Sequence, residues 1–124
     1  MKDQIKHCFS VEDTSHIADG LHNATETMME SGFEEYKIPL RMRNGIRRYL
    51  LLGEDMGHFL TALFENDFQM TVARADDENR GMLREWAFFV YNYVPSGSWG
   101  SKEKVVAYAN RIKLLNGQTG EDGS

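Results

Sequence analysis

The chain has 124 residues, enough for one domain with a single hydrophobic core. Its one cysteine, Cys8, excludes an intrachain disulfide and a thiolate metal cluster within one chain, and it favours a reducing compartment. The formal net charge of −5 argues against general binding to nucleic acid, because that binding depends on lysine and arginine neutralising phosphates.

The N-terminal segment, residues 1–37, is expected to be partly helical or mobile. Its first residues, MKDQIKHCFSVEDTSH, scatter charge where a signal peptide or membrane span needs an uninterrupted apolar run. We therefore expect a protein that is neither exported nor embedded in a membrane. Further along the segment, side chains recur at helical spacing, although a glycine weakens the pattern: Ile17, Leu21, Thr25, Met28 and Met29.

Residues 38–115 are expected to form a helical core domain. A first helix is predicted from Pro39, which suits a first helical position, to Leu52, after which a glycine supplies a stop. Residues 54–75 continue with a helical period, and they fit either one long helix or two helices joined near Asn66.

Two more helices are predicted, over residues 77–93 and from Ser101 to about residue 115. Pro95 ends the first of them, and residues 116–124 are expected to be a disordered tail because they carry glycine and charge with nothing to bury. The sequence therefore predicts an all-α fold, a small compact bundle of about four to five helices.

The predicted helix over residues 77–93 carries apolar side chains around most of its circumference. Trp86, Phe89 and Tyr93 offer more apolar surface than one side of a small bundle can cover. We therefore predict that these three residues form an interface and that the protein is a homo-oligomer, with a dimer as the default symmetry.

A cluster of five basic residues falls within twelve positions of this acidic chain: Lys37, Arg41, Arg43, Arg47 and Arg48. On a helix the arginines flank the apolar stripe, so they could bind a phosphorylated ligand or an acidic protein surface. The alternative interpretation is that they pair with carboxylates of the fold, for which the candidates are Glu34, Glu35, Asp67 and residues 76–78.

The loop SGSWGSKEK precedes the last predicted helix and offers a second candidate anion site. Free backbone N–H groups near Ser101, together with Lys102, could hold an anion, and Trp99 could stack on a base or ring. The alternative is a plain connector in which Ser101 caps the helix and Trp99 covers the core.

Asp67 also has two interpretations. In a continuous helix it lies within the apolar stripe as a buried carboxylate, and Arg74, Arg80 or an arginine of the basic cluster would have to neutralise it. In the other interpretation, Asn66 or Asp67 caps a second helix.

No residue pattern predicts catalysis, a metal ion or a cofactor. The histidines His7, His16, His22 and His58 are scattered without metal-ligand spacing. An enzyme remains an alternative only if carboxylates and an arginine line a pocket, the candidates being Glu65, Asp67, Arg74 and Asp76.

Three stretches, IPLRMRNGIRRYL, GHFLTALFENDFQMTVARADDENRGML and FVYNYVPSGSWGSKEKV, resemble a family of small bacteriophage and mobile-element proteins of unassigned function. The resemblance covers residues 38 to about 111 and implies a phage protein in the host cytoplasm. By analogy with small accessory phage proteins, we expect non-catalytic binding to a host defence or regulatory protein. One alternative is a sponge, a protein that sequesters a phosphorylated small molecule or cyclic nucleotide. The other is the enzyme with a pocket of carboxylates and an arginine.

Overall fold

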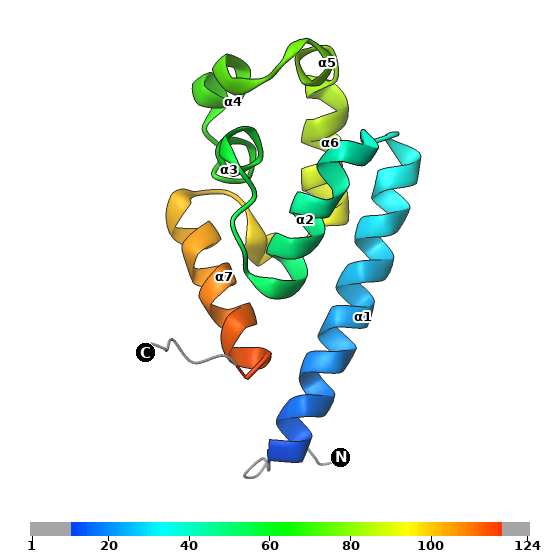
Figure 1. Ribbon diagram of the computed structural model, residues 1–124, viewed down its shortest axis with the longest axis vertical. Coiled ribbons are helices and arrows are strands. Elements are labelled where there is room, and N and C mark those ends of the chain that lie inside the picture. Colours follow the sequence, from blue (N-terminus) through cyan, green and yellow to red (C-terminus); the bar gives the residue numbers. More distant parts are fainter. Residues whose placement is uncertain (1–10, 118–124) are drawn as a thin grey trace.

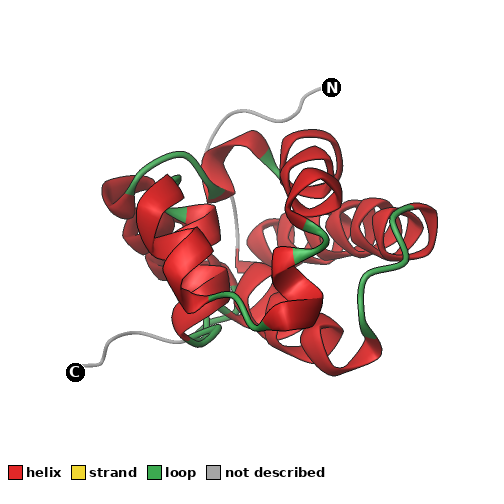
Figure 2. Cartoon of the chain, turned by 90° about the horizontal axis from the view of Figure 1, so that it is seen from above, coloured by secondary structure: helices red, strands yellow, loops and turns green. Residues whose placement is uncertain are grey.

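The computed structural model describes residues 11–117, with side chains from residue 22 onward. Helices are its only regular secondary structure, and no strand occurs within this range (Figures 1 and 2). The all-α prediction is confirmed, but the predicted number of four to five helices is too low for the described chain. Its elements are α1 (Val11–Glu35), α2 (Leu40–Leu52), α3 (His58–Phe64), α4 (Phe68–Arg74), α5 (Asp77–Arg80), α6 (Leu83–Tyr93), the 3₁₀ turn η1 (Ser96–Ser98) and α7 (Lys102–Leu115).

The additional helices arise from breaks in the middle of the chain. Asn66 adopts a left-handed backbone conformation with φ of 64°, which ends any continuous helix. The Asp67 side chain then caps α4 by accepting a hydrogen bond from the Met70 amide at 3.1 Å. Asp76 caps α5 in the same way through the Asn79 amide at 2.9 Å. Of the two predicted alternatives, two helices joined near Asn66 is therefore the one that forms.

The long helix α1 packs against α2, α6 and α7, and α2 also packs against α7 (Figure 1). The core lies between these helices, with α3 contributing further apolar side chains. Its buried residues are Met29, Phe33, Ile38, Ile46, Tyr49, Leu50, Phe59, Leu60, Phe64, Ala75, Trp86, Phe89, Val90, Val94, Val105, Tyr108 and Ile112.

The packed core begins earlier than the predicted boundary at residue 38, because α1 contributes Met29 and Phe33, both fully buried. The Phe33 ring stacks on that of Phe89 with centroids 5.4 Å apart. Gly32 permits this approach, since a Cβ atom there would lie only 2.6 Å from Cγ of Tyr93 on α6. The N-terminal segment therefore supplies part of the core.

Two buried tyrosine hydroxyls join α2 to η1 and to α7. The Tyr49 hydroxyl of α2 donates to the carbonyl oxygen of Ser98 at 2.7 Å, and the Tyr108 hydroxyl of α7 donates to that of Leu50 at 2.7 Å. Burial raises the pKa of Tyr108 to about 12, so this hydroxyl keeps its proton and its hydrogen bond near pH 10, where an ordinary tyrosine is half ionised.

The C-terminal end of the described chain stays in contact with the fold. Asn116, the first residue of the predicted tail, donates from Nδ2 to the Leu51 carbonyl oxygen at 3.0 Å. Residues 118–124 of that tail, and Cys8 at the other end, lie outside the described residues. Within the described range, no helix combines the length and the apolar character needed to cross a membrane.

Candidate binding site

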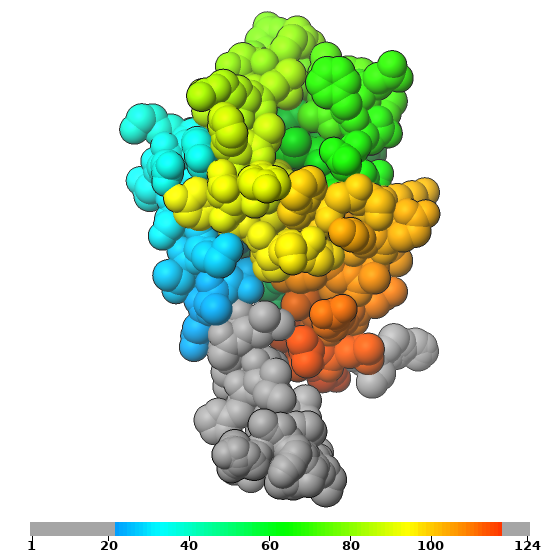
Figure 3. Space-filling model, turned by 180° about the vertical axis from the view of Figure 1, so that it is seen from behind, coloured from blue at the N-terminus to red at the C-terminus, as the bar shows by residue number. Residues whose placement is uncertain are grey.

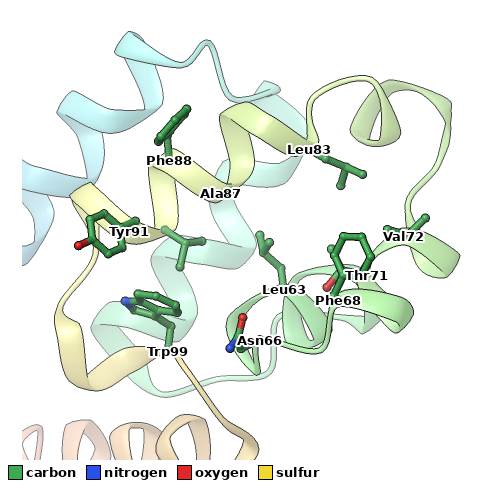
Figure 4. A pocket seen from close by; sticks show the side chains of 11 residues that line it. Leu63, Asn66, Phe68, Thr71, Val72, Leu83, Ala87, Phe88, Tyr91 and Trp99 are labelled. Atoms are coloured by element: carbon green, nitrogen blue, oxygen red, sulfur yellow. The ribbon is translucent and has the colours of Figure 1, made fainter.

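A hollow of about 420 Å³ lies between α6 and the α3–α4 pair. It is on the face where, in Figure 3, the yellow-green surface of α6 lies beside the green surface of α3 and α4. One wall comes from α6: Leu83, Ala87, Phe88, Val90 and Tyr91. The opposite wall comes from α3 and α4: Leu63, Phe68, Thr71 and Val72. Trp99 and Asn66 lie together at one end (Figure 4).

Local backbone geometry explains why this hollow forms. The left-handed Asn66 and the capping Asp67 turn the chain back, so that α4 packs on α3 and leaves space beside α6. The loop after η1 is fastened to α3 by a hydrogen bond from the Gly100 amide to the Phe64 carbonyl oxygen at 2.8 Å. That bond places the neighbouring Trp99 at the end of the hollow (Figure 4).

Aromatic side chains stand at both edges of the hollow. Phe68, at the start of α4, is 76% exposed, and Tyr91 on α6 is 72% exposed. Tyr91 also meets Trp99 edge to face, with ring centroids 6.2 Å apart. Phe88 stacks on Tyr36, which directly follows α1, and stays partly exposed. Such concave apolar surfaces with aromatic edges are typical of binding sites.

Few polar groups face the hollow. The Thr71 hydroxyl donates to the Asp67 carbonyl oxygen at 2.6 Å, so it is already engaged within α4. The remaining polar atoms of the lining belong to Asn66, Tyr91 and Trp99. This arrangement suits the burial of apolar side chains far better than the binding of a charged ligand.

Two of the basic-cluster arginines bond to α5 and α1. Arg41 donates to Asp76 and Glu78, each at 2.8 Å. Arg43 donates to Glu34 at 2.9 Å and also to the carbonyl oxygens of residues 38 and 33, at 2.7 and 3.3 Å.

The other two arginines are paired as well. Arg47 donates to both carboxylate oxygens of Glu30, at 2.6 and 3.1 Å, while Arg48 lies 3.6 Å from a carboxylate oxygen of Glu54. No arginine of the described chain lines the hollow. The geometry thus favours pairing with carboxylates of the fold. Of the partners observed, Glu30 and Glu54 had not been predicted.

Replacing Arg43 with methionine is expected to lower the free energy of unfolding by about 2 kcal/mol, because two carbonyl oxygens and a carboxylate lose their charged donor. The Arg43 side chain is only 12% exposed. The matched variant Arg41→Met, at a side chain that is 50% exposed, should cost less than about 1 kcal/mol. Urea unfolding followed by circular dichroism measures both, and equal losses would contradict this assignment.

The Glu30–Arg47 pair predicts a pH dependence. The hydrogen bond from Arg47, with the charges of Arg47 and Arg43, lowers the pKa of Glu30 from its usual 4.5. Since the pKa is lower in the folded state, the pair's contribution is complete above pH 4.5 and is lost as the pH falls below it. The urea concentration at the midpoint of unfolding should therefore decrease as the pH is lowered from about 6 to about 3. Glu30→Gln and Arg47→Met should reduce that drop by the same amount. An unchanged drop in either variant would refute the contribution of the Glu30–Arg47 pair.

Asp67 and Arg74 do not form the predicted buried pair. Both residues are exposed, and Asp67 serves as the N-cap of α4. Arg74 instead donates to the His58 carbonyl oxygen at 3.2 Å. The prediction failed because it assumed a continuous helix, in which Asp67 would share the apolar stripe.

The predicted interface residues are also placed differently. Trp86 and Phe89 have no exposed surface, because α1 and α3 cover them, so they cannot meet another molecule. Tyr93 is half-buried, and its hydroxyl donates to the Glu35 carboxylate. The exposed aromatic residues of α6 are instead Phe88 and Tyr91, neither of which was predicted as an interface residue, although their spacing from the buried Val90 and Phe89 places them outward.

The loop before α7 follows its simpler interpretation. The Ser101 hydroxyl accepts a hydrogen bond from the Lys104 amide at 3.1 Å and caps α7, while Lys102 is exposed. Trp99 lines the hollow, whereas none of the four arginines of the anion hypothesis is a lining residue. The structure therefore does not bring Trp99, Ser101 and the four arginines together around one ligand.

Phe68 is the functional candidate that sequence analysis missed most clearly. It directly follows a capping aspartate, a position at the start of a helix that commonly stays at the surface. That local signal identifies an exposed phenylalanine only once the break at Asn66 is known. Within residues 22–117, no group of three histidine, cysteine, aspartate or glutamate side chains is arranged to hold a metal ion.

Comparisons with protein-family models, curated proteins and solved structures gave no match to this chain.

Proposed function

We propose that this chain is a non-catalytic binding protein and that the hollow between α4 and α6 receives apolar side chains of a partner protein. The observation that carries the proposal is the exposure of Phe68 and Tyr91 on opposite edges of an apolar hollow. Exposed aromatic residues around a concave apolar surface provide most of the affinity in many protein interfaces. The partner's contribution is therefore a bulky apolar residue or a short apolar segment.

The biological setting of this proposal comes from the resemblance to phage proteins. A small phage protein in the host cytoplasm acts by occupying a surface of a host defence or regulatory protein. Stoichiometric binding needs no catalytic group, only a surface that the partner fits.

The two alternatives have less support. A sponge for phosphorylated ligands needs free arginines, whereas Arg41 and Arg47 donate to carboxylates. An enzyme needs a carboxylate that can exchange a proton in a pocket. None of the carboxylates proposed for catalysis, Glu65, Asp67 and Asp76, lines the hollow.

Site-specific photo-crosslinking tests the proposal. A photoreactive amino acid replaces Ala87, an exposed residue that lines the hollow, or Ala107, an exposed residue of α7 that serves as the control. We expect position 87, and not position 107, to give an adduct with one host protein in cells that carry the chain. Mass spectrometry identifies that protein.

Binding is then measured with the purified partner. Ala87→Arg should weaken it at least about tenfold, because the new charge would be buried in an apolar hollow, while Ala107→Arg should leave it unchanged. Equal crosslinking from both positions, or no adduct other than with a second copy of the chain, would overturn the proposal.

A further inference from the structure

The α4 edge of the hollow combines a projecting aromatic side chain with negative charge. Phe68 is 76% exposed, and the two acids that precede it, Glu65 and Asp67, form no ion pair with any described residue. Asp67 is itself exposed, so its charge faces solvent beside Phe68. This edge is thus an apolar projection flanked by acids.

The α6 edge carries the opposite charge. The Arg84 guanidinium lies over the Phe88 ring, 4.8 Å from its centroid, and within the described chain it has no carboxylate partner. Arg84 follows the lining residue Leu83 and lies two helical turns before Tyr91, so it stands at the α6 edge of the hollow. A ligand that matches both edges needs an acidic group and an exposed apolar side chain, and the α4 edge of a second copy presents both.

The exposed aromatic residues supply most of the apolar area that a dimer needs. Phe68, Tyr91 and Phe88 are 76%, 72% and 38% exposed. Since burying a whole aromatic side chain removes about 150–250 Å² from water, these three offer roughly 350 Å². A specific interface needs at least roughly 500 Å² from each copy. The aliphatic wall of Leu63, Leu83 and Val72, with part of Trp99, supplies the remainder.

We propose that, without a partner protein, two copies of this chain associate with two-fold symmetry, the Phe68 side chain of each filling the hollow of the other. In such an isologous pair, Glu65 and Asp67 of each copy face Arg84 of the other, so the charge contact occurs twice. The inference rests on the proposed function, because both use the same hollow as the binding site. Self-association therefore competes with binding of the partner protein.

Sedimentation equilibrium of the full chain over about 5–500 μM tests the association. We expect the mass to rise from 14.2 kDa toward twice that value. Phe68→Ser should raise the dissociation constant at least about tenfold. The matched control Leu40→Ser removes a side chain that is equally exposed but lies at the start of α2, outside the hollow, and should have no effect.

Mixing two variants tests the reciprocal geometry. Phe68→Ser lacks the projection but keeps the other lining residues of the hollow, whereas Ala87→Arg keeps the projection but blocks the hollow. Each variant alone should stay monomeric, whereas their mixture should form a mixed dimer with one intact contact. Circular dichroism verifies that both variants remain helical.

The proposal would be overturned if the parent chain stayed monomeric at about 500 μM. It would also be overturned if Phe68→Ser and Leu40→Ser changed the dissociation constant equally, or if the two variants formed no mixed dimer. Failure here is distinguishable from failure of the proposed function. A monomeric chain that still crosslinks to a host protein through position 87 retains the function and loses only the dimer. A dimer that never captures a host protein retains self-association and loses the proposed function.

Discussion

Replacing Gly53 with alanine is expected to lower the free energy of unfolding by about 3 kcal/mol. Gly53 ends α2 with φ of 76°, a left-handed conformation that costs other residues about 1–2 kcal/mol. In addition, a Cβ atom there would lie 2.5 Å from the carbonyl oxygen of Ala109 in α7. That oxygen belongs to a helix backbone and cannot move without displacing α7, so overpacking adds about 1–3 kcal/mol.

Gly117 provides the control for this substitution. Its φ of 81° is close to that of Gly53, but a Cβ atom there would meet nothing within 4 Å. Gly117→Ala should therefore cost only the conformational strain, about 1–2 kcal/mol. Urea unfolding followed by circular dichroism compares the two variants with the parent chain. If both lost the same stability, the close contact between the end of α2 and α7 would be refuted.

Truncating Trp86 to alanine is expected to cost about 4 kcal/mol, since the side chain is fully buried against Phe59 and Phe89. The substitution also removes the indole N–H that donates to Oδ1 of Asn79 at 3.1 Å. Because Asn79 is itself buried, that oxygen loses its donor where water has little access.

Tyr91 serves as the control, because it lies on the same helix but is exposed. Tyr91→Ala should change the free energy of unfolding by less than about 1 kcal/mol. Thermal unfolding of both variants, each measured at one low concentration, decides the result. If Trp86→Ala kept the parent's stability but abolished self-association, Trp86 would be an interface residue and not a core residue.

Local signals explain which helices could be predicted. Residues 39–52 were predicted as a helix, and α2 spans Leu40–Leu52, because a proline at its start and Gly53 at its end are signals read from adjacent residues. The same holds for Ser101 as the cap of α7. The break at Asn66 could only be offered as an alternative, since its left-handed backbone leaves no pattern in the apolar period.

The candidate site depended on contacts distant in sequence, which explains why less of it was predicted. Trp86 and Phe88 both look apolar on a helix, and Trp86 is the covered one because Phe59 of α3 packs against it. Likewise, Arg47 could be recognised as needing an acid, but its partner Glu30 depends on how α1 packs beside α2. A helical period identifies an apolar face without specifying what covers it.

The chain carries two tryptophans in contrasting surroundings. Trp86 is sealed inside the core, while Trp99 is half-buried at the end of the hollow. Acrylamide should therefore quench the emission of Trp99 well before that of Trp86, and an occupant of the hollow should shield Trp99 alone. With Trp99→Phe as the spectroscopic blank, the fluorescence of the unlabelled protein distinguishes occupation of the hollow from unfolding of the core.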